Sequence, residues 1–351
     1  MRSTLGVGFL GSGPVTQAIH LPTLARLTDL FTVRHLNDID AGVAETVASR
    51  TGAAYSTSLE TLLDDPLVDV VAICSPHAFH AEQAIAACRA GKKAVLCEKP
   101  MAMSGDEAAT IAAVSAETGV PVLVGAMHTF DPGWRAAVAQ WGELPAASHT
   151  IRSSIVLPPN SRFEDLATEV LTRSDFPSLD FSDVQVRAAM VHAGVMGLAV
   201  HDLPLVRRFL SRYDDLQILS ASLLAPFGYR ILIVADGKVV ELHAVVSQTW
   251  QPSWVLDAYA DDQVLHTEFT PSYVHAGSAV STLTTAESAQ VFGPSSSNGY
   301  EAEWLELAAV VRGEVEPPDL DGLVDDLRFT VAVADAAAEA VRSADRAEAA
   351  A

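Results

Sequence analysis

The sequence predicts two kinds of fold in one chain, an α/β domain followed by an α+β domain. Up to about residue 126, short apolar segments alternate with helical segments, and each apolar segment is hydrophobic throughout. Strands of this kind are typical of a parallel, doubly wound sheet with helices on both faces. Beyond residue 126, strand-like segments follow one another without helices between them, which indicates a large, mostly antiparallel open sheet. We therefore expect domains over residues 1–126 and 127–351.

The first domain is predicted from a regular alternation of elements. The expected strands cover residues 4–10, 31–36, 53–55, 68–74, 94–97 and 120–124. The expected helices cover residues 15–27, 41–51, 59–63, 79–90 and 104–118. Ser104 and Glu107 have the spacing of a capping box at the start of the last helix.

The second domain contains six expected strands and three expected helices. The strands cover residues 149–156, 216–224, 229–234, 239–250, 254–260 and 263–269, and the Asp236-Gly237 pair is a hairpin signal. The helices cover residues 196–210, 300–311 and 320–342. Residues 158–183 are rich in proline and aspartate and weakly patterned, so we expect a surface insertion there.

Composition excludes several classes of partner. The 351 residues carry a formal net charge of −22, which opposes binding to nucleic acid or to an anionic membrane. No apolar run reaches the length of a membrane span, and the glycine-broken start is too short for a signal-peptide core. A cytoplasmic protein is expected. Its three cysteines are expected to be reduced and buried, because none forms a CxxC pair.

A glycine-rich turn follows the first expected strand. Gly11-Ser12-Gly13 lies between a strand and a helix, the context in which backbone amides bind the pyrophosphate of a dinucleotide. We therefore assign Gly11, Ser12, Gly13, Pro14 and Val15 to cofactor binding. Thr16 stands where a third glycine or alanine is common, so a tight turn without a ligand is the alternative.

An acid ends the second expected strand. Asp38 can accept hydrogen bonds from both ribose hydroxyls and would repel a 2′-phosphate. We therefore predict NAD as the cofactor, with NADP possible.

Two further strand ends carry polar residues. Ser75, Pro76, His77 and His80 follow the fourth strand, and Glu98-Lys99-Pro100 closes the fifth. Ligands bind at the carboxyl ends of strands in open α/β sheets, so these residues are candidates for the same site. The alternatives are a locally bonded helix histidine, an exposed loop histidine and a solvated strand end.

Three segments carry a family resemblance. GFLGSG, VDVVAICSPHAFHAEQAIAACRAGKKAVLCEKPMA and VLVGAMHTFDPGW resemble the glucose–fructose oxidoreductase/inositol dehydrogenase/rhizopine catabolism (Gfo/Idh/MocA) family of NAD(P)-dependent oxidoreductases. The resemblance implies a Rossmann domain and hydride transfer between nicotinamide and a sugar- or polyol-like alcohol. It implies that Lys99 holds the substrate hydroxyl and the cofactor ribose, and that Glu98 lies at the cofactor. It also implies dimers or tetramers formed through the second domain's sheet.

The chain departs from the family pattern at its second catalytic element. The family commonly has Asp–x–Gly–x–His–x–x–Asp on a helix. This chain keeps the histidine as His201 but has Gly197, Ala199 and Pro204 at the other three positions. Asp202 follows the histidine and would point about 100° away on a helix. We predict that His201 is the general acid/base, the alternative being a histidine packed against the other domain.

A second departure is Met127-His128, where relatives often have Asn-Arg. His128 is a candidate for cofactor or substrate contact, with an ordinary loop histidine as the alternative. Arg152 and Asp202 are weaker candidates for substrate contact.

The predicted activity is that of a dehydrogenase or ketoreductase acting on a sugar, amino sugar or cyclitol. Lys99 would polarise the substrate oxygen and His201 would transfer its proton, without a metal. Two alternatives remain at this point. One is a family member that binds the dinucleotide as a sensor, and the other uses bound NAD as an internal redox relay for glycoside elimination or hydrolysis.

Overall fold

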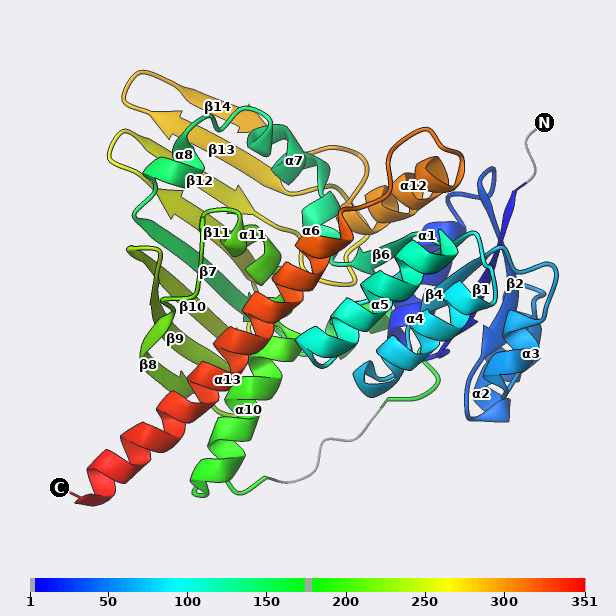
Figure 1. Ribbon diagram of the computed structural model, residues 1–351, viewed down its shortest axis with the longest axis horizontal. Helices are drawn as coiled ribbons and strands as arrows, with labels where there is room; N and C mark the ends of the chain where they lie inside the picture. The colour runs from blue at the N-terminus through cyan, green and yellow to red at the C-terminus, as the bar shows by residue number, and fades with distance from the viewer. Residues whose placement is uncertain (1–3, 174–178, 351) are drawn as a thin grey trace. The chain divides into compact units, whose positions relative to one another are not determined.

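A computed structural model describes residues 4–173 and 179–350 (Figure 1). It divides into two compact units. Unit 1 comprises Met1–Ala126, Ser161–Asp175 and Tyr300–Leu327, and unit 2 comprises Met127–Asn160, Phe176–Gly299 and Arg328–Ala351. One division falls between residues 126 and 127, and the described residues 161–173 and 300–327 group with the first unit. The two predicted domain ranges stay a prediction.

Unit 1 is built on a six-stranded sheet in the order β3-β2-β1-β4-β5-β6, and every pairing is parallel. This confirms the doubly wound sheet predicted from the apolar strands. The strands are β1 (Leu5–Leu10), β2 (Phe31–Asn37), β3 (Ala54–Ser56), β4 (Val70–Ile73), β5 (Ala94–Glu98) and β6 (Val122–Gly125). All residues of β1, β4 and β5 are buried, as expected for strands covered on both faces.

The connecting helices of unit 1 follow the predicted alternation. They are η1 (Thr16–His20), α1 (Leu21–Leu24), α2 (Ala41–Ser49), α3 (Leu59–Leu63), η2 (His77–Phe79), α4 (His80–Arg89) and α5 (Gly105–Thr118). Figure 1 shows α4 and α5 side by side, and they contact each other. Ser104 caps α5 by accepting the Glu107 amide at 3.2 Å, and the Glu107 carboxylate accepts the Met103 amide, so the predicted cap is present.

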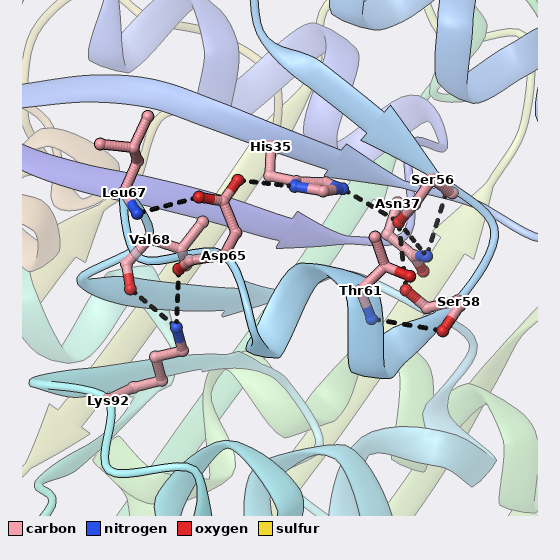
Figure 2. A network of polar contacts seen from close by, with 9 residues as sticks. All are labelled: His35, Asn37, Ser56, Ser58, Thr61, Asp65, Leu67, Val68 and Lys92. Carbon is pink, nitrogen blue, oxygen red and sulfur yellow. Dashed lines mark hydrogen bonds and ion pairs between the residues drawn. The ribbon is translucent and has the colours of Figure 1, made fainter.

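A buried polar network holds β2 in place (Figure 2). His35 joins Asp65 through Nδ1 and Ser56 through Nε2, both at 2.9 Å. Lys92 donates to the carbonyl oxygens of Asp65 and Val68 at 3.2 and 2.9 Å. Burial opposes the charge of Lys92 and lowers its pKa, although nearby aspartates act in the opposite direction. The network fixes the strand whose end carries Asp38.

Unit 2 contains an eight-stranded sheet in the order β14-β13-β12-β11-β7-β10-β9-β8. All pairings are antiparallel except that of β7 with β10, as predicted for a mostly antiparallel sheet. The strands are β7 (Thr150–Leu157), β8 (Gln217–Leu223), β9 (Phe227–Ala235), β10 (Lys238–Val246), β11 (Ser253–Tyr259), β12 (Gln263–Glu268), β13 (Val280–Thr285) and β14 (Ala289–Phe292). The sequence prediction missed β13 and β14. The hairpin at Asp236-Gly237 is confirmed, with φ values of 53° and 69°.

One face of this sheet is buried and the other is half-buried. Ile151, Ser153 and Ile155 of β7 are buried, whereas Arg152 between them is exposed. Because side chains alternate along a strand, Arg152 lies on the opposite face from Ser153.

The helices of unit 2 correct one expectation. They are α6 (Met127–Phe130), α7 (Pro132–Val138), α8 (Leu144–Ala147), α10 (Val184–Gly197), η3 (Ala199–His201) and α11 (Leu203–Arg207). The continuous helix predicted over residues 196–210 is therefore wrong. Leu198 leaves the helical region with φ −120°, and Pro204 lies in the first turn of α11, where its missing amide is tolerated. Because this segment is broken, Asp202 does not have to point away from His201, as it would on a continuous helix.

The remaining helices are α9 (Ser161–Ala167), α12 (Gly299–Val311) and α13 (Leu320–Ala350). Residues 174–178 of the predicted surface insertion lie outside the described residues, and the described part of the insertion contains α9. Figure 1 shows α10 and α13 side by side, and Arg342 of α13 donates to Gln185 of α10 at 3.0 Å. Across the described residues, no helix has both the length and the apolar character needed to cross a membrane. The cytoplasmic location stays a prediction.

Candidate active site

The glycine-rich turn of unit 1 has one constrained and one open glycine. Gly11 has φ +92°, and a Cβ added there would lie 2.7 Å from the Cys74 carbonyl oxygen. A Cβ added at Gly13 would meet no atom within 4 Å in the part of the chain that the structure describes, its chain neighbours aside. Thr16 donates to the Gly11 carbonyl at 2.6 Å, and Gln17 donates to the Ser12 carbonyl at 2.7 Å. These two side-chain hydrogen bonds fix the backbone of the turn. The open space beside Gly13 fits the close backbone approach that a pyrophosphate requires.

Asp38 lies directly beside this turn. Its Oδ2 accepts the Ser12 amide at 2.9 Å, and its Oδ1 accepts the Asp40 amide at 3.0 Å. The carboxylate is half-buried at the end of β2. The structure therefore brings the predicted ribose-binding acid next to the predicted phosphate-binding turn.

His80 connects the ends of β4 and β5. Its Nε2 lies 2.8 Å from the Ser75 carbonyl oxygen and its Nδ1 lies 2.7 Å from the Pro100 carbonyl oxygen. The ring is 1% exposed. Both nitrogens thus face backbone carbonyls, so His80 positions the two strand ends. The cofactor contact predicted for Ser75, Pro76, His77 and His80 stays a prediction, and the bonds of His80 favour an indirect role for that residue.

Charged groups gather at the end of β5. Burial lowers the pKa of Lys99, although the charge of Glu98 acts in the opposite direction. Burial, the charge of Lys99 and that of His80 lower the pKa of His77 to about 4. His77 is therefore neutral at pH 7 beside a lysine whose ammonium is less stable than usual. A lysine of this kind can donate a hydrogen bond to a substrate oxygen and also release a proton.

Glu98 belongs to a buried cluster that the sequence did not predict. Glu98 Oε1 lies 3.0 Å from His20 Nε2, and Trp304 donates its indole N–H to His20 Nδ1 at 3.1 Å. Glu303 is 0% exposed, and neither of its oxygens has a hydrogen-bond partner among the described residues. The signal in the sequence was an acid and a histidine at otherwise buried helical positions, which alone does not indicate that they meet.

The hydrogen bonds in this cluster show which atoms carry the protons. His20, Glu98 and Glu303 place potential ligand atoms within 4.8 Å of one another. The Trp304 N–H is only a donor, so His20 Nδ1 is the acceptor and Nε2 carries the proton given to Glu98. That tautomer leaves no lone pair on Nε2 for a cation. The geometry favours a network of shared protons over a metal centre.

The two carboxyl groups differ in their charge. Burial would raise the pKa of Glu98, but the hydrogen bond from His20 and the charge of Lys99 bring it below the usual value. Burial raises the pKa of Glu303 well above 4.5, and the charge of Glu98 raises it further. The surroundings therefore favour the ionised form of Glu98 and the protonated form of Glu303.

Replacing Glu303 by glutamine is expected to stabilise the protein as the pH rises. The folded state holds the Glu303 proton above pH 4.5, where the unfolded chain releases it, so this group lowers stability with increasing pH. One such proton corresponds to at most about 1.4 kcal/mol per pH unit. Urea unfolding at several pH values from 5 to 8 measures the difference between Glu303→Gln and the wild type.

The matched control is Glu314→Gln, an exposed acid, whose effect on unfolding is expected to be independent of pH. A pH-independent difference for Glu303→Gln as well would contradict a protonated Glu303.

Unit 2 holds a second cluster around Asp202, which is 0% exposed. Its Oδ1 lies 2.9 Å from His128 Nδ1, and its Oδ2 accepts the Ser153 hydroxyl at 2.6 Å. The Trp254 indole N–H donates to both oxygens, at 3.0 and 2.8 Å. Protein donors thus surround the carboxylate, and the substrate contact predicted for Asp202 stays a prediction that this arrangement does not favour.

His128 is enclosed by aromatic rings. It stacks on Phe269 with a centroid separation of 3.9 Å and meets the edge of Trp254 at 4.6 Å. The His201 ring lies 5.8 Å from the His128 ring and 5.3 Å from Trp254. The structure therefore brings together His128, His201 and Asp202, three of the predicted site residues. Ser153 and Trp254 were missed, because the sequence does not show which strand residues face the broken helix.

Arg152 does not join this cluster. It pairs with Glu241 at 2.7 Å, and its guanidinium lies 5.9 Å from the Tyr259 ring centroid, on the sheet face opposite Ser153. The substrate contact predicted for Arg152 is therefore not supported by its placement.

Comparison with known proteins identifies the family. Residues 5–126 match the model of an oxidoreductase family with an NAD-binding Rossmann fold, named Gfo/Idh/MocA. Inositol 2-dehydrogenase from Acidothermus cellulolyticus is 30% identical over 255 residues, covering 67% of this chain and 72% of that protein. The chain belongs to the Gfo/Idh/MocA family. The cofactor of this family is a nicotinamide dinucleotide, which the Gly11–Gly13 turn and Asp38 fit.

Other relatives match over the N-terminal part of the chain. Inositol 2-dehydrogenase 2 from Saccharopolyspora erythraea is 35% identical over 133 residues, which cover 37% of this chain and 39% of that protein. An uncharacterised oxidoreductase from Bacillus subtilis is 32% identical over 136 residues, again 39% of its length. The chain thus matches about two fifths of these Gfo/Idh/MocA proteins.

Solved structures share the fold over nearly the whole chain. The UDP-N-acetylglucosamine 3-dehydrogenase from Acidithiobacillus ferrooxidans gives a TM-score of 0.73 at 16% identity, covering 97% of this chain and all of that one. A 3-ketoreductase from Actinomadura kijaniata, solved with NADP and TDP-benzene, gives a TM-score of 0.69 at 19% identity, with 97% and 98% covered. At these identities the likeness establishes the Gfo/Idh/MocA fold in both units.

Proposed function

We propose that this chain transfers a hydride between the nicotinamide of NAD(P) and a hydroxyl or keto carbon of a sugar, amino sugar or cyclitol. The observation that carries the proposal is the partly buried Lys99 at the carboxyl end of β5. In the parallel sheet the Gly11–Gly13 turn and Asp38 follow the carboxyl ends of β1 and β2, and these lie at the same end of the sheet as Lys99. Relatives named as inositol 2-dehydrogenases and a UDP-N-acetylglucosamine 3-dehydrogenase support the substrate class.

The proposed roles follow from side-chain chemistry. Lys99 donates a hydrogen bond to the substrate oxygen and stabilises the negative charge that develops there during oxidation. His201 accepts the hydroxyl proton, or returns it in the reduction direction. The dinucleotide supplies hydride chemistry when it is bound. The other predicted site residues bind or orient these groups, and the proposed step needs no metal.

A turnover assay tests this proposal. The protein is incubated with NAD⁺ or NADP⁺ and a panel of cyclitols, free sugars and nucleotide sugars that includes myo-inositol and UDP-N-acetylglucosamine, and with NADH or NADPH and keto-sugars. A change in the absorbance of the reduced nicotinamide is expected with at least one member. Tight cofactor binding without turnover would favour a sensor. Product formed without net cofactor reduction would favour an internal redox relay. If no dinucleotide bound, the proposed hydride transfer and these two alternatives would all be refuted.

Asp38→Asn is expected to change the cofactor preference. The amide keeps an oxygen for the Ser12 amide but removes the negative charge that repels a 2′-phosphate. The dissociation constant for NADH should rise by about tenfold, within the range of a hydrogen bond to a charged group, while that for NADPH falls. Fluorescence titration with both cofactors measures the ratio. An unchanged ratio would mean that Asp38 holds only the turn.

We also propose that the half-buried face of the unit 2 sheet mediates assembly into dimers or tetramers. This face carries paired charges, Arg152 with Glu241 and His266 with Asp257. Light scattering of the wild type and of Arg152→Glu tests the proposal, and a monomeric wild type would overturn it.

A further inference from the structure

His128 presents a buried nitrogen that lacks a hydrogen-bond partner. The Asp202 carboxylate is an acceptor, so the proton of the neutral ring lies on Nδ1, and Nε2 is left as an acceptor. Nε2 has no hydrogen-bond partner among the described residues, and the side chain is almost fully buried. A buried polar atom left in this state costs about 1–3 kcal/mol and needs an explanation.

Asp202 is arranged to hold a negative charge against this ring. The Ser153 hydroxyl and the Trp254 indole donate to it, in addition to His128. A carboxylate that orients an imidazole through Nδ1 fixes the tautomer and stabilises the imidazolium when Nε2 takes a proton. Among the described residues, His201 and Tyr229 are titratable groups that lie near this pair. Burial raises the pKa of Tyr229 well above its usual value, and the charge of Asp202 raises it further, so Tyr229 stays neutral.

The residue type at position 128 matters for this chemistry. An arginine at this position would have donors only and would pair with the carboxylate permanently. Histidine keeps the donor toward Asp202 and adds an acceptor on the other side of the ring. The His201 ring, the predicted acid/base, lies 5.8 Å away between centroids. That separation is compatible with a bridge through one water molecule between the two rings.

We propose that Asp202 and His128 form the inner half of a proton relay whose outer member is His201, an inference that rests on the proposed hydride transfer. During oxidation the substrate C–H bond breaks and both electrons pass with the hydrogen to nicotinamide. The substrate O–H bond breaks, its proton goes to one nitrogen of His201, and the proton on the other nitrogen of His201 passes through the bridging water to His128 Nε2. The carbonyl product, the reduced dinucleotide and a His128 imidazolium paired with Asp202 balance the step, and reduction runs it in reverse.

The relay assigns positioning roles to His128 and Asp202, because neither is required to touch the substrate. A purely structural pair is the competing explanation, since the same bonds join α6 to β7 and β11.

Two substitutions separate these explanations. His128→Asn and His128→Arg each keep a donor for Asp202 but lack an acceptor at the Nε2 position. With a substrate found in the turnover panel, kcat is expected to fall by about 10²-fold, the lower end of a general acid–base contribution. KM and the dissociation constant for NADH should stay within about threefold, and the acid limb of the kcat–pH profile should move. His243→Asn, on the opposite sheet face, is the matched control and should leave kcat and its profile unchanged.

The results that overturn the relay are distinct from failure of the proposed function. If the folded variants keep kcat within threefold with the wild-type pH profile, the pair is structural. Nitrogen-15 NMR of the histidine rings gives a readout without a substrate. It should show the Nδ1–H tautomer for His128 in the wild type and its loss in Asp202→Asn, and a wild-type Nε2–H tautomer refutes the relay. If the tautomer is as expected but the wild type turns over no substrate, hydride transfer fails and the relay falls with it.

Discussion

Lys99→Ala is expected to lower kcat/KM by about 10²–10³-fold, the loss typical of removing one donor from a developing oxyanion. The side chain lies at the carboxyl end of β5, where burial lowers its pKa. A hydrogen bond from an incompletely solvated ammonium strengthens as negative charge grows on the substrate oxygen, so the loss should appear mainly in kcat. Steady-state kinetics on the substrate found in the panel measure it.

Lys93→Ala is the matched control, because Lys93 is exposed and pairs with Asp69 at the surface, at 2.7 Å. Its kinetics should equal those of the wild type. Lys99→Arg keeps the charge and should move the alkaline limb of the pH profile upward, since arginine does not lose its proton in this range. A Lys99→Ala enzyme with wild-type kcat would remove Lys99 from the reaction.

The fold was largely predictable because its signals are local. Fully apolar strands such as β1 and β4 are buried on both faces, and a parallel sheet covered by helices is the structure that buries them. The hairpin at Asp236-Gly237 depends on two residues that tolerate positive φ. An Asp-Gly pair can be recognised in the sequence without any structure. The strands β13 and β14 escaped prediction because their residues alternate weakly between small polar and apolar types.

The candidate site was predictable only where it follows strand ends. Lys99, Asp38 and the glycine turn were found because parallel strands bring their carboxyl ends to one edge. The pairing of His128 with Asp202 could not be found, because it depends on the break at Leu198 and on the register that turns Ser153 inward. The contact between His20 and Trp304 joins residues 284 positions apart, a separation that local patterns cannot bridge.

Gly13→Ala is expected to weaken dinucleotide binding without destabilising the fold. The added methyl group meets no protein atom within 4 Å, so the free energy of unfolding should change by no more than about 1 kcal/mol. The methyl would occupy the space into which the pyrophosphate must come, and the dissociation constant for NADH should rise by at least about tenfold, or 1.4 kcal/mol. Fluorescence titration and urea unfolding on the same preparations separate the two effects.

Gly11→Ala provides the opposite case two residues away. Gly11 has a φ of +92°, and a Cβ added there would lie 2.7 Å from the Cys74 carbonyl oxygen. The substitution would therefore strain the folded protein even without a cofactor. We expect a loss of about 1–3 kcal/mol in the free energy of unfolding, before any effect on the cofactor. Equal destabilisation by both substitutions would mean that Gly13 also serves the turn. If Gly13→Ala bound NADH as tightly as the wild type, the dinucleotide would not approach the backbone at Gly13. The added methyl group has no close contact with the described residues, so the dinucleotide is what it would obstruct.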